Sequence, residues 1–169
     1  SILNENNHKI LSSSVIYGPN ASGKTNMIGA MEVFKYIILH GKIQNIEDKN
    51  TPNIAVNKLE VIPNVDNDKE PVDFYIKFIE KGLIFEYSLS IYIGSFFASN
   101  YDERKILSEK LVVNDKIIFS RSDKKVQFDD LKSIEKSFIN NYFVKEFEEN
   151  KESVINIAQN NISSKELFL

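Results

Sequence analysis

The stretch VIYGPNASGKTNMIGAMEVFKYIILHGK, residues 15–42, contains the pattern that decides the fold. A short β-branched and aromatic run that starts at Ser12 ends at Gly18, and a loop separates it from a helical pattern. The helical pattern is an apolar stripe at positions i, i+3, i+4, i+7 and i+11, formed by Met27, Ala30, Met31, Phe34 and Ile38. Gly41 follows as a stop signal. The sequence therefore predicts a strand, a loop and a helix across residues 12–42.

The loop between these elements fits the phosphate-binding pattern G-x-x-x-x-G-K-[ST] through Gly18, Gly23, Lys24 and Thr25. Glycines permit a tight turn whose backbone N–H groups point at an anion, and the positive N-terminal end of the helix faces the same place. Here these N–H groups are those from Ala21 to Thr25, including Ser22. We expect Lys24 to reach the β- and γ-phosphates as the catalytic residue, and Thr25 to be the Mg²⁺ ligand. The predicted cofactors are ATP and Mg²⁺. A chance glycine-rich turn and a degenerate loop that binds nucleotide without turnover are the alternatives.

A β-rich section is predicted over residues 59–128, where the apolar period changes from 3.6 to 2. Residues 43–71 are a connecting region with one short strand in LEVIP, residues 59–63. A turn at Lys81-Gly82 places one apolar set on a common face, in the pairs Phe78 with Phe85, Ile76 with Tyr87 and Phe74 with Leu89. A second hairpin turns at Asn114-Asp115, and KKVQF, residues 124–128, is a further strand.

A helical section, residues 129–160, completes the predicted order. It begins with Asp129 or Asp130 as N-cap of a helix in DDLKSIEKSFINNYFVKEF, followed by a shorter helix in ESVINIAQN. The predicted fold class is α/β with α+β character, in which a P-loop strand, loop and helix join an antiparallel hairpin section and then helices. From their length, we expect residues 1–169 to form one domain or one incomplete piece of a larger one. The start at Ser1 without methionine suggests a fragment.

Composition limits the classes of function. With 169 residues, 42% of them hydrophobic and 27% charged, the chain can bury a core. A net charge of -3 gives no general attraction to nucleic acid or anionic membrane. The absence of cysteine excludes disulfides and thiolate metal sites, and no apolar run approaches the roughly 18 residues of a membrane span. We expect a cytoplasmic protein without membrane partners.

The loop GPNASGKTN with the helix MIGAMEVFK resembles that of ABC-class ATPases of the SMC, RecF and OLD-like kind, and bacterial AAA-family ATP-binding proteins most of all. EYSLSI, LSEKLVVNDKIIFSR and ESVINIAQNN also resemble that group's β-rich insert and following helices. The resemblance implies that Asn20 and Asn26 join the nucleotide-binding residues. Ala21 stands where an ABC transporter subunit more often has glycine, which disfavours transport.

The resemblance also implies that residues 1–169 are the N-terminal portion of one ABC-type ATPase domain, which lacks parts of the complete protein. Such ATPases close ATP between two heads of a homodimer, with a Walker B strand and an L-S-G-G signature loop, and neither pattern occurs here. The nearest imitation of Walker B, GLIFE at 82–86, places Glu86 on the polar side of a hairpin. The implied function is MgATP binding, with hydrolysis in the complete dimeric protein, coupled to DNA-linked work or phage defence with a DNA or nuclease partner. A nucleotide-sensing assembly module and a transporter ATPase subunit are the alternatives.

Other chemistry-bearing residues give weaker signals. His8 and His40 lack a carboxylate partner pattern, so we favour surface or helix-end positions over a metal site. Gln44 lies after the helix as a Mg²⁺-sensing glutamine would, but a solvated loop position is favoured. A small basic cluster near a turn consists of Arg121, Lys124 and Lys125. We interpret it as a charged hairpin tip rather than a DNA contact. A solvated acidic face is expected at Glu146, Glu148, Glu149 and Glu152.

Overall fold

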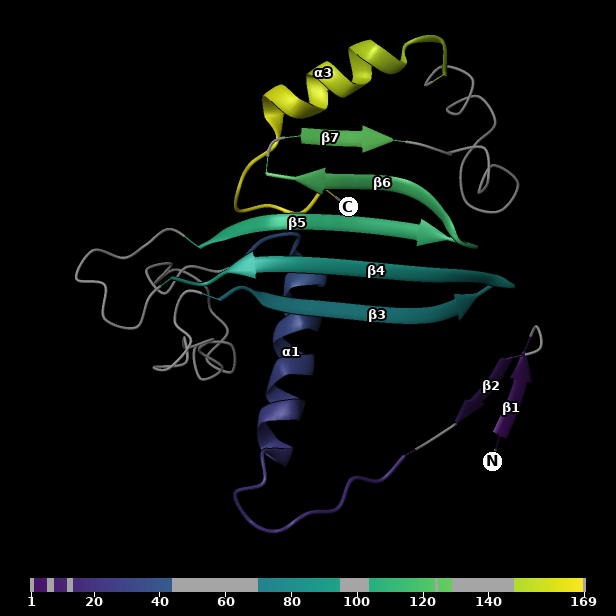
Figure 1. Ribbon diagram of the computed structural model, residues 1–169, viewed down its shortest axis with the longest axis vertical. Coiled ribbons are helices and arrows are strands. Elements are labelled where there is room, and N and C mark those ends of the chain that lie inside the picture. Colours follow the sequence, from purple (N-terminus) through teal and green to yellow (C-terminus); the bar gives the residue numbers. More distant parts are fainter. Residues whose placement is uncertain are drawn as a thin grey trace.

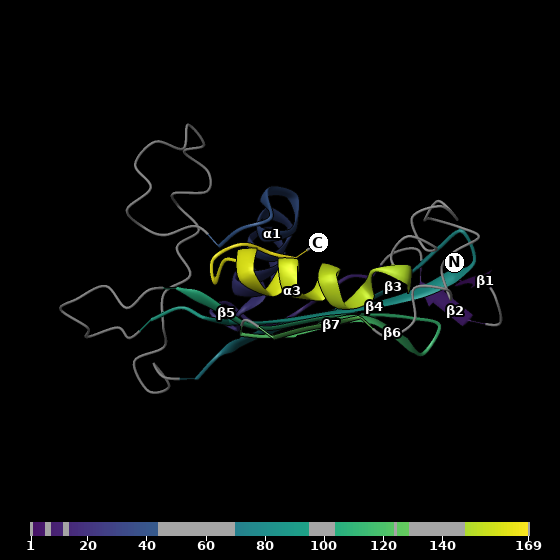
Figure 2. The ribbon, with the colours of Figure 1, turned by 90° about the horizontal axis from the view of Figure 1, so that it is seen from above.

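A five-stranded antiparallel sheet with the two described helices on one face forms the body of the described part of the chain (Figures 1 and 2). The computed structural model describes residues 2–5, 8–11, 14–43, 70–94, 104–123, 125–128 and 148–168. The sheet is a meander in which each strand pairs with the next along the chain, in the order β3-β4-β5-β6-β7. Its strands are β3 (Val72–Glu80), β4 (Leu83–Tyr92), β5 (Lys105–Val113), β6 (Lys116–Ser122) and β7 (Lys125–Phe128). The two described helices are α1 (Lys24–His40) and α3 (Lys151–Asn161).

Both predicted hairpins are confirmed, the first with its register and the second with its turn at Asn114-Asp115. Phe78 pairs with Phe85, Ile76 with Tyr87 and Phe74 with Leu89, as the alternating pattern requires. The turn residues Lys81 and Gly82 have φ values of 49° and 78°, and Asn114 and Asp115 have 48° and 65°. Two successive left-handed residues are the geometry of a type I′ turn, whose twist matches that of paired strands. The predicted strand in KKVQF is β7.

Helix α1 packs on the sheet through its C-terminal half only. The Phe34 ring stacks on the Phe74 ring with centroids 5.0 Å apart, and Ile37 is buried against the sheet. The predicted helix and its stop are confirmed, since Gly41 is the left-handed C-cap and its N–H bonds the Ile37 carbonyl. The predicted stripe is wrong in part, because Met27 and Met31 are 49% and 65% exposed and Ile38 is also exposed. The N-terminal half of α1 extends beyond β3 and away from the sheet (Figure 1).

The predicted strand before the loop is not formed. Residues 14–19 are extended but carry no strand pairing, and Ser12 and Ser13 lie outside the described residues. A strand needs a neighbour for its N–H and C=O groups, and no strand in the described part of the chain pairs with this one. Val15 and Tyr17 are therefore 71% and 88% exposed. The structure instead has a hairpin that the sequence analysis missed, β1 (Ile2–Glu5) with β2 (His8–Leu11).

The C-terminal segment, residues 162–168, connects the end of α1 with strand β5 of the sheet. Lys42 forms a bridge with Glu166, and the Ile43 N–H donates to the Lys165 carbonyl at 2.9 Å. On its other side, the Ile106 N–H of β5 donates to the Ser164 carbonyl at 2.7 Å. The core lies between the sheet on one side and α1 with the segment 162–168 on the other. Its buried members are Ile37, Ile43, Tyr87, Leu89, Ile91, Ile93, Ile106 and Phe119.

The predicted shorter helix is confirmed as α3, whose side chains lie over β7; Gln159 Nε2 donates to the Val126 carbonyl. The strand predicted in LEVIP and the helix predicted over DDLKSIEKSFINNYFVKEF lie outside the described residues. The observed architecture is a mixed α/β fold with a five-stranded antiparallel sheet, in agreement with the α+β character expected.

Candidate functional site

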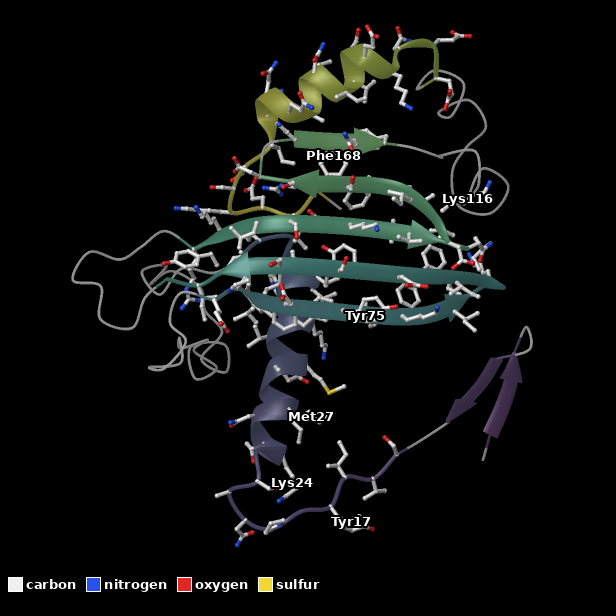
Figure 3. All side chains as sticks on the ribbon, viewed as in Figure 1. Tyr17, Lys24, Met27, Tyr75, Lys116 and Phe168 are labelled. Atoms are coloured by element: carbon white, nitrogen blue, oxygen red, sulfur yellow. The ribbon has the colours of Figure 1, made fainter. Side chains whose placement is uncertain are left out.

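The candidate site is the loop from Gly18 to Gly23 and the first turn of α1, at the far end of the helix from the sheet (Figure 3). Gly23 is the N-cap and has φ 86°, a left-handed conformation that favours glycine. Ala21 also has positive φ, at 62°. The Ser22 N–H donates to the Pro19 carbonyl at 3.3 Å, which closes the loop into a turn. The sequence therefore forms a compact loop directly before the helix.

Lys24 folds back over this loop. Its ammonium group donates to the Gly18 carbonyl at 2.7 Å, to the Pro19 carbonyl at 2.6 Å and to Ser22 Oγ at 3.2 Å. A lysine ammonium has three donors and no acceptor, so these three oxygens match its donors. The cation thus lies at the centre of the loop, where it can exchange carbonyl partners for phosphate oxygens.

The space at Gly18 is a second test of fit. A Cβ added at Gly18 would lie 2.7 Å from Ser22 Oγ, closer than real Cβ contacts allow. The same Cβ would lie 3.8 Å from the Lys24 ammonium nitrogen. A side chain at position 18 would therefore displace the Ser22 hydroxyl, which lies beside the Lys24 ammonium.

The N-terminus of α1 provides further donors for an anion. Gly23 offers no side-chain cap, and the first turn contains no acidic residue. The first N–H groups of a helix have no carbonyl partner within it, and the helix dipole adds positive charge at this end. The Met27 N–H already bonds the Gly23 carbonyl at 3.1 Å, so the donors that face outward belong to the residues before it. These groups fit a chain of phosphates.

Thr25 lies in the first turn of α1 and is exposed, as are Asn20, Ala21, Ser22 and Asn26. The structure thus brings together all the residues predicted from the motif in one loop and one helical turn, while their roles stay predictions. A Thr hydroxyl with phosphate oxygens and water suits Mg²⁺, which takes few protein ligands at nucleotide sites. No cluster of three or more His, Asp or Glu side chains is found among the described residues.

Glu86 has a structural environment on the sheet. Its Oε2 accepts a hydrogen bond from the Tyr75 hydroxyl at 2.7 Å, and its Oε1 pairs with the Lys77 ammonium at 2.7 Å. The hydrogen bonds from Lys77 and then from Tyr75 lower the pKa of the Glu86 carboxyl. In Figure 3 Tyr75 lies on the sheet and Lys24 lies near the opposite end of α1. These contacts occupy both carboxylate oxygens, in keeping with the polar side of the hairpin predicted for Glu86.

The prediction of a charged hairpin tip is wrong for Arg121. Its side chain is 2% exposed and faces Glu109 across the β5-β6 pair, because both lie on the covered face of the sheet. Glu109 Oε1 accepts a hydrogen bond from the Tyr87 hydroxyl at 2.9 Å. Burial raises the pKa of Tyr87, with a further contribution from the Glu109 charge, and burial lowers the pKa of Arg121. The sequence signal was available: counting by twos from Val113 places Glu109 on the apolar face.

The remaining candidates divide between described and undescribed residues. His40 ends α1, where its Nδ1 lies 2.9 Å from the Tyr36 carbonyl and its ring stacks on the Tyr36 ring, a helix-end position as expected. His8 lies in β2. Lys125 begins β7 and is exposed, and Glu152 lies in the first turn of α3. Gln44, Lys124 and Glu146 lie outside the described residues.

Comparison with known proteins gives one match. A family described as "AAA domain, putative AbiEii toxin, Type IV TA system" has a model that matches residues 13–164, which include the loop, α1 and the whole sheet. No curated protein and no solved structure matches significantly. Within the described residues, no helix is long and apolar enough to cross a membrane.

Proposed function

Because the chain belongs to this family of AAA domains, we propose that it binds MgATP at the Gly18–Thr25 loop and that the complete protein hydrolyses it. AAA-family membership supports nucleotide binding, and the observation that carries the proposal is the Lys24 ammonium held inside the loop. Two carbonyls and one hydroxyl of the loop hold this ammonium group, and phosphate oxygens can replace them because hydrogen bonds to charged oxygens are stronger.

In the proposed mechanism the loop N–H groups and the helix N-terminus bind the β- and γ-phosphates of the substrate. Lys24 leaves the Gly18 and Pro19 carbonyls and bonds phosphate oxygens, where its charge stabilises the phosphoryl group during transfer. Thr25 would hold Mg²⁺, which supplies charge neutralisation at the phosphates when bound. Asn20 and Asn26 flank this position and would orient the nucleotide.

The finer class is also a proposal. The motif resembles ABC-type ATPases of the SMC, RecF and OLD-like kind, in which two heads of a homodimer enclose ATP. Residues for water activation and the signature loop are then supplied outside this loop. The family description contains the words "putative AbiEii toxin" of a toxin–antitoxin system, and we propose a role in phage defence on this ground. DNA-linked work with a DNA or nuclease partner is proposed from the resemblance of the motif alone.

Titration calorimetry of the chain with ATP, with and without Mg²⁺, tests this proposal. We expect saturable Mg²⁺-dependent binding that is lost in Lys24→Ala and that loses its Mg²⁺ dependence in Thr25→Ala. Lys35→Ala is the matched control, because Lys35 is an exposed lysine of the same helix, paired only at 3.8 Å with Glu32. A folded chain that does not bind ATP, or that binds equally well as Lys24→Ala, would disprove the proposal.

Phosphate release and copurification separate the proposed ATPase from its two alternatives. A nucleotide-sensing assembly module binds MgATP but releases no phosphate in the complete protein. A transporter subunit copurifies with membrane partners, whereas the ATPase that we propose turns over without them.

A further inference from the structure

A charged pair lies in the core, away from the phosphate loop. The side chains of Glu109 and Arg121 are 1% and 2% exposed and face each other across β5 and β6. The Arg121 Nη1 is 3.7 Å from the Glu109 Oε2. A buried charge is tolerated only where a partner and hydrogen bonds replace its water. The bonds that satisfy this pair therefore show what it holds in place.

Most of those bonds go to one segment, residues 162–168. Arg121 donates through Nη1 to the Glu166 carbonyl at 2.7 Å and through Nη2 to the Ser163 carbonyl. Glu109 Oε2 accepts from the Phe168 N–H at 2.8 Å. A third Arg121 bond, from Nε at 3.0 Å, goes to the Asp123 carbonyl at the end of its own strand. The pair thus binds the C-terminal segment at three points along its length.

The same segment holds the C-terminal end of α1. The Gly41 carbonyl accepts from the Leu167 N–H, and Ile43 and Lys42 pair with Lys165 and Glu166. In the described part of the chain, α1 also packs on the core cluster through partly buried Val33 and Phe34 and buried Ile37. Its other half, with the loop, projects beyond the sheet (Figures 1 and 3). The segment therefore contributes to setting the direction of the helix.

We propose that Arg121 is a positioning residue for the phosphate loop, and that it acts through the 162–168 segment and α1. This inference rests on the proposed function of the loop. A helix of this length spans roughly 25 Å as a stiff rod, so a small change of direction at Gly41 displaces Lys24. In the proposed role, Arg121 keeps the loop in the orientation in which nucleotide and the remaining catalytic groups meet.

The test compares variants that remove the attachment with one that only weakens the sheet. Arg121→Met removes the donors to Ser163 and Glu166 but leaves Glu109 buried without its charged partner. The double variant Glu109→Leu with Arg121→Met removes both charges, and such replacements commonly preserve folding. Ile118→Ala is the control, because Ile118 packs in the cluster of Val113, which includes no residue of α1 or of the segment 162–168, although it shares Leu111 and Phe128 with the core cluster.

We expect the double variant to unfold cooperatively and to bind MgATP at least tenfold more weakly than the wild-type chain. Hydrogen exchange at the Ile43 and Leu167 amides should accelerate in the same variant. Arg121→Lys should have intermediate affinity, because one ammonium keeps the charge but cannot span both carbonyls. Ile118→Ala should be less stable and bind MgATP normally.

Wild-type affinity in the folded double variant would overturn the inference and leave the proposed function intact. Equal weakening by Ile118→Ala would also overturn it, since general loosening of the sheet would then explain the effect. Absence of binding in the wild-type chain, with no difference from Lys24→Ala, would remove both the proposed function and this inference.

Discussion

Replacing Tyr87 by phenylalanine should remove a specific dependence of stability on alkaline pH. The Tyr87 hydroxyl is buried and donates to Glu109 Oε1 at 2.9 Å, so ionisation would place a phenolate beside a carboxylate in the core. Burial, followed by the Glu109 charge, holds the pKa of Tyr87 well above its ordinary value of 10.0. The folded chain therefore keeps a proton that the unfolded chain releases above pH 10.

The sign and size follow from proton linkage. A raised pKa in the folded state contributes stability that is fully present below pH 10 and is lost as pH rises further. With an unfolded pKa near 10, one such group lowers the free energy of unfolding by about 1.4 kcal/mol at pH 11 relative to neutral pH. At neutral pH Tyr87→Phe leaves one Glu109 oxygen without its donor, which costs about 1–3 kcal/mol. The two stabilities should therefore converge between pH 9 and pH 11.

Urea unfolding of both proteins at pH 8, 9, 10 and 11 measures this difference. The wild-type curve should fall more steeply, and the variant should lack that one contribution while retaining those of Tyr75 and Lys77, whose pKa values are also raised. An absorbance titration of tyrosinate should show one fewer late-titrating group in the variant. A stability difference that stays constant from pH 8 to pH 11 would refute the reasoning.

Three further substitutions test the packing and the turns. Phe34→Ala removes the ring stacked on Phe74 and should lower the free energy of unfolding by about 2–3 kcal/mol, less than at a fully buried site. An unchanged free energy of unfolding would contradict this packing. Gly41→Ala should cost about 1 kcal/mol from backbone strain alone, because an added Cβ meets nothing within 4 Å while φ is 67°, and Gly41→Asn should cost less in the same denaturation assay. Lys81→Asn should raise the melting temperature through about 0.5–1 kcal/mol of stabilisation, because asparagine tolerates the left-handed φ of 49° better; a lower melting temperature would argue against the turn.

Local patterns predicted the β3-β4 and β5-β6 hairpins, the loop and α1, although the local β1-β2 hairpin was missed. A period of two fixes which residues share a face, and a two-residue turn fixes the register, so the pairing of Phe78 with Phe85 required no other information. The glycine at 41 similarly marks the end of α1. These features depend on residues within a few positions of one another.

Features that depend on distant residues were missed or predicted wrongly. The run at 12–17 has strand composition, but strand formation requires a partner that the local sequence cannot provide. Arg121 looked like a surface residue because its neighbours are polar, whereas its partners Ser163 and Glu166 lie far along the chain. The stripe of α1 was only partly right, since the sheet covers Phe34 and Ile37 but does not reach Met27.

The meander order of the sheet has a consequence for how the chain folds. Each strand from β3 to β7 pairs with its sequence neighbour, so the chain closes two-residue turns and one longer connection, residues 93–104, and the entropic cost is small. The hydrogen bond between Ile43 and Lys165 joins residues that precede and follow all of these strands in the sequence, so it closes a long loop. We therefore expect the sheet to form early and α1 to dock late, so that during synthesis the phosphate loop reaches its final orientation only after the C-terminal segment has been made.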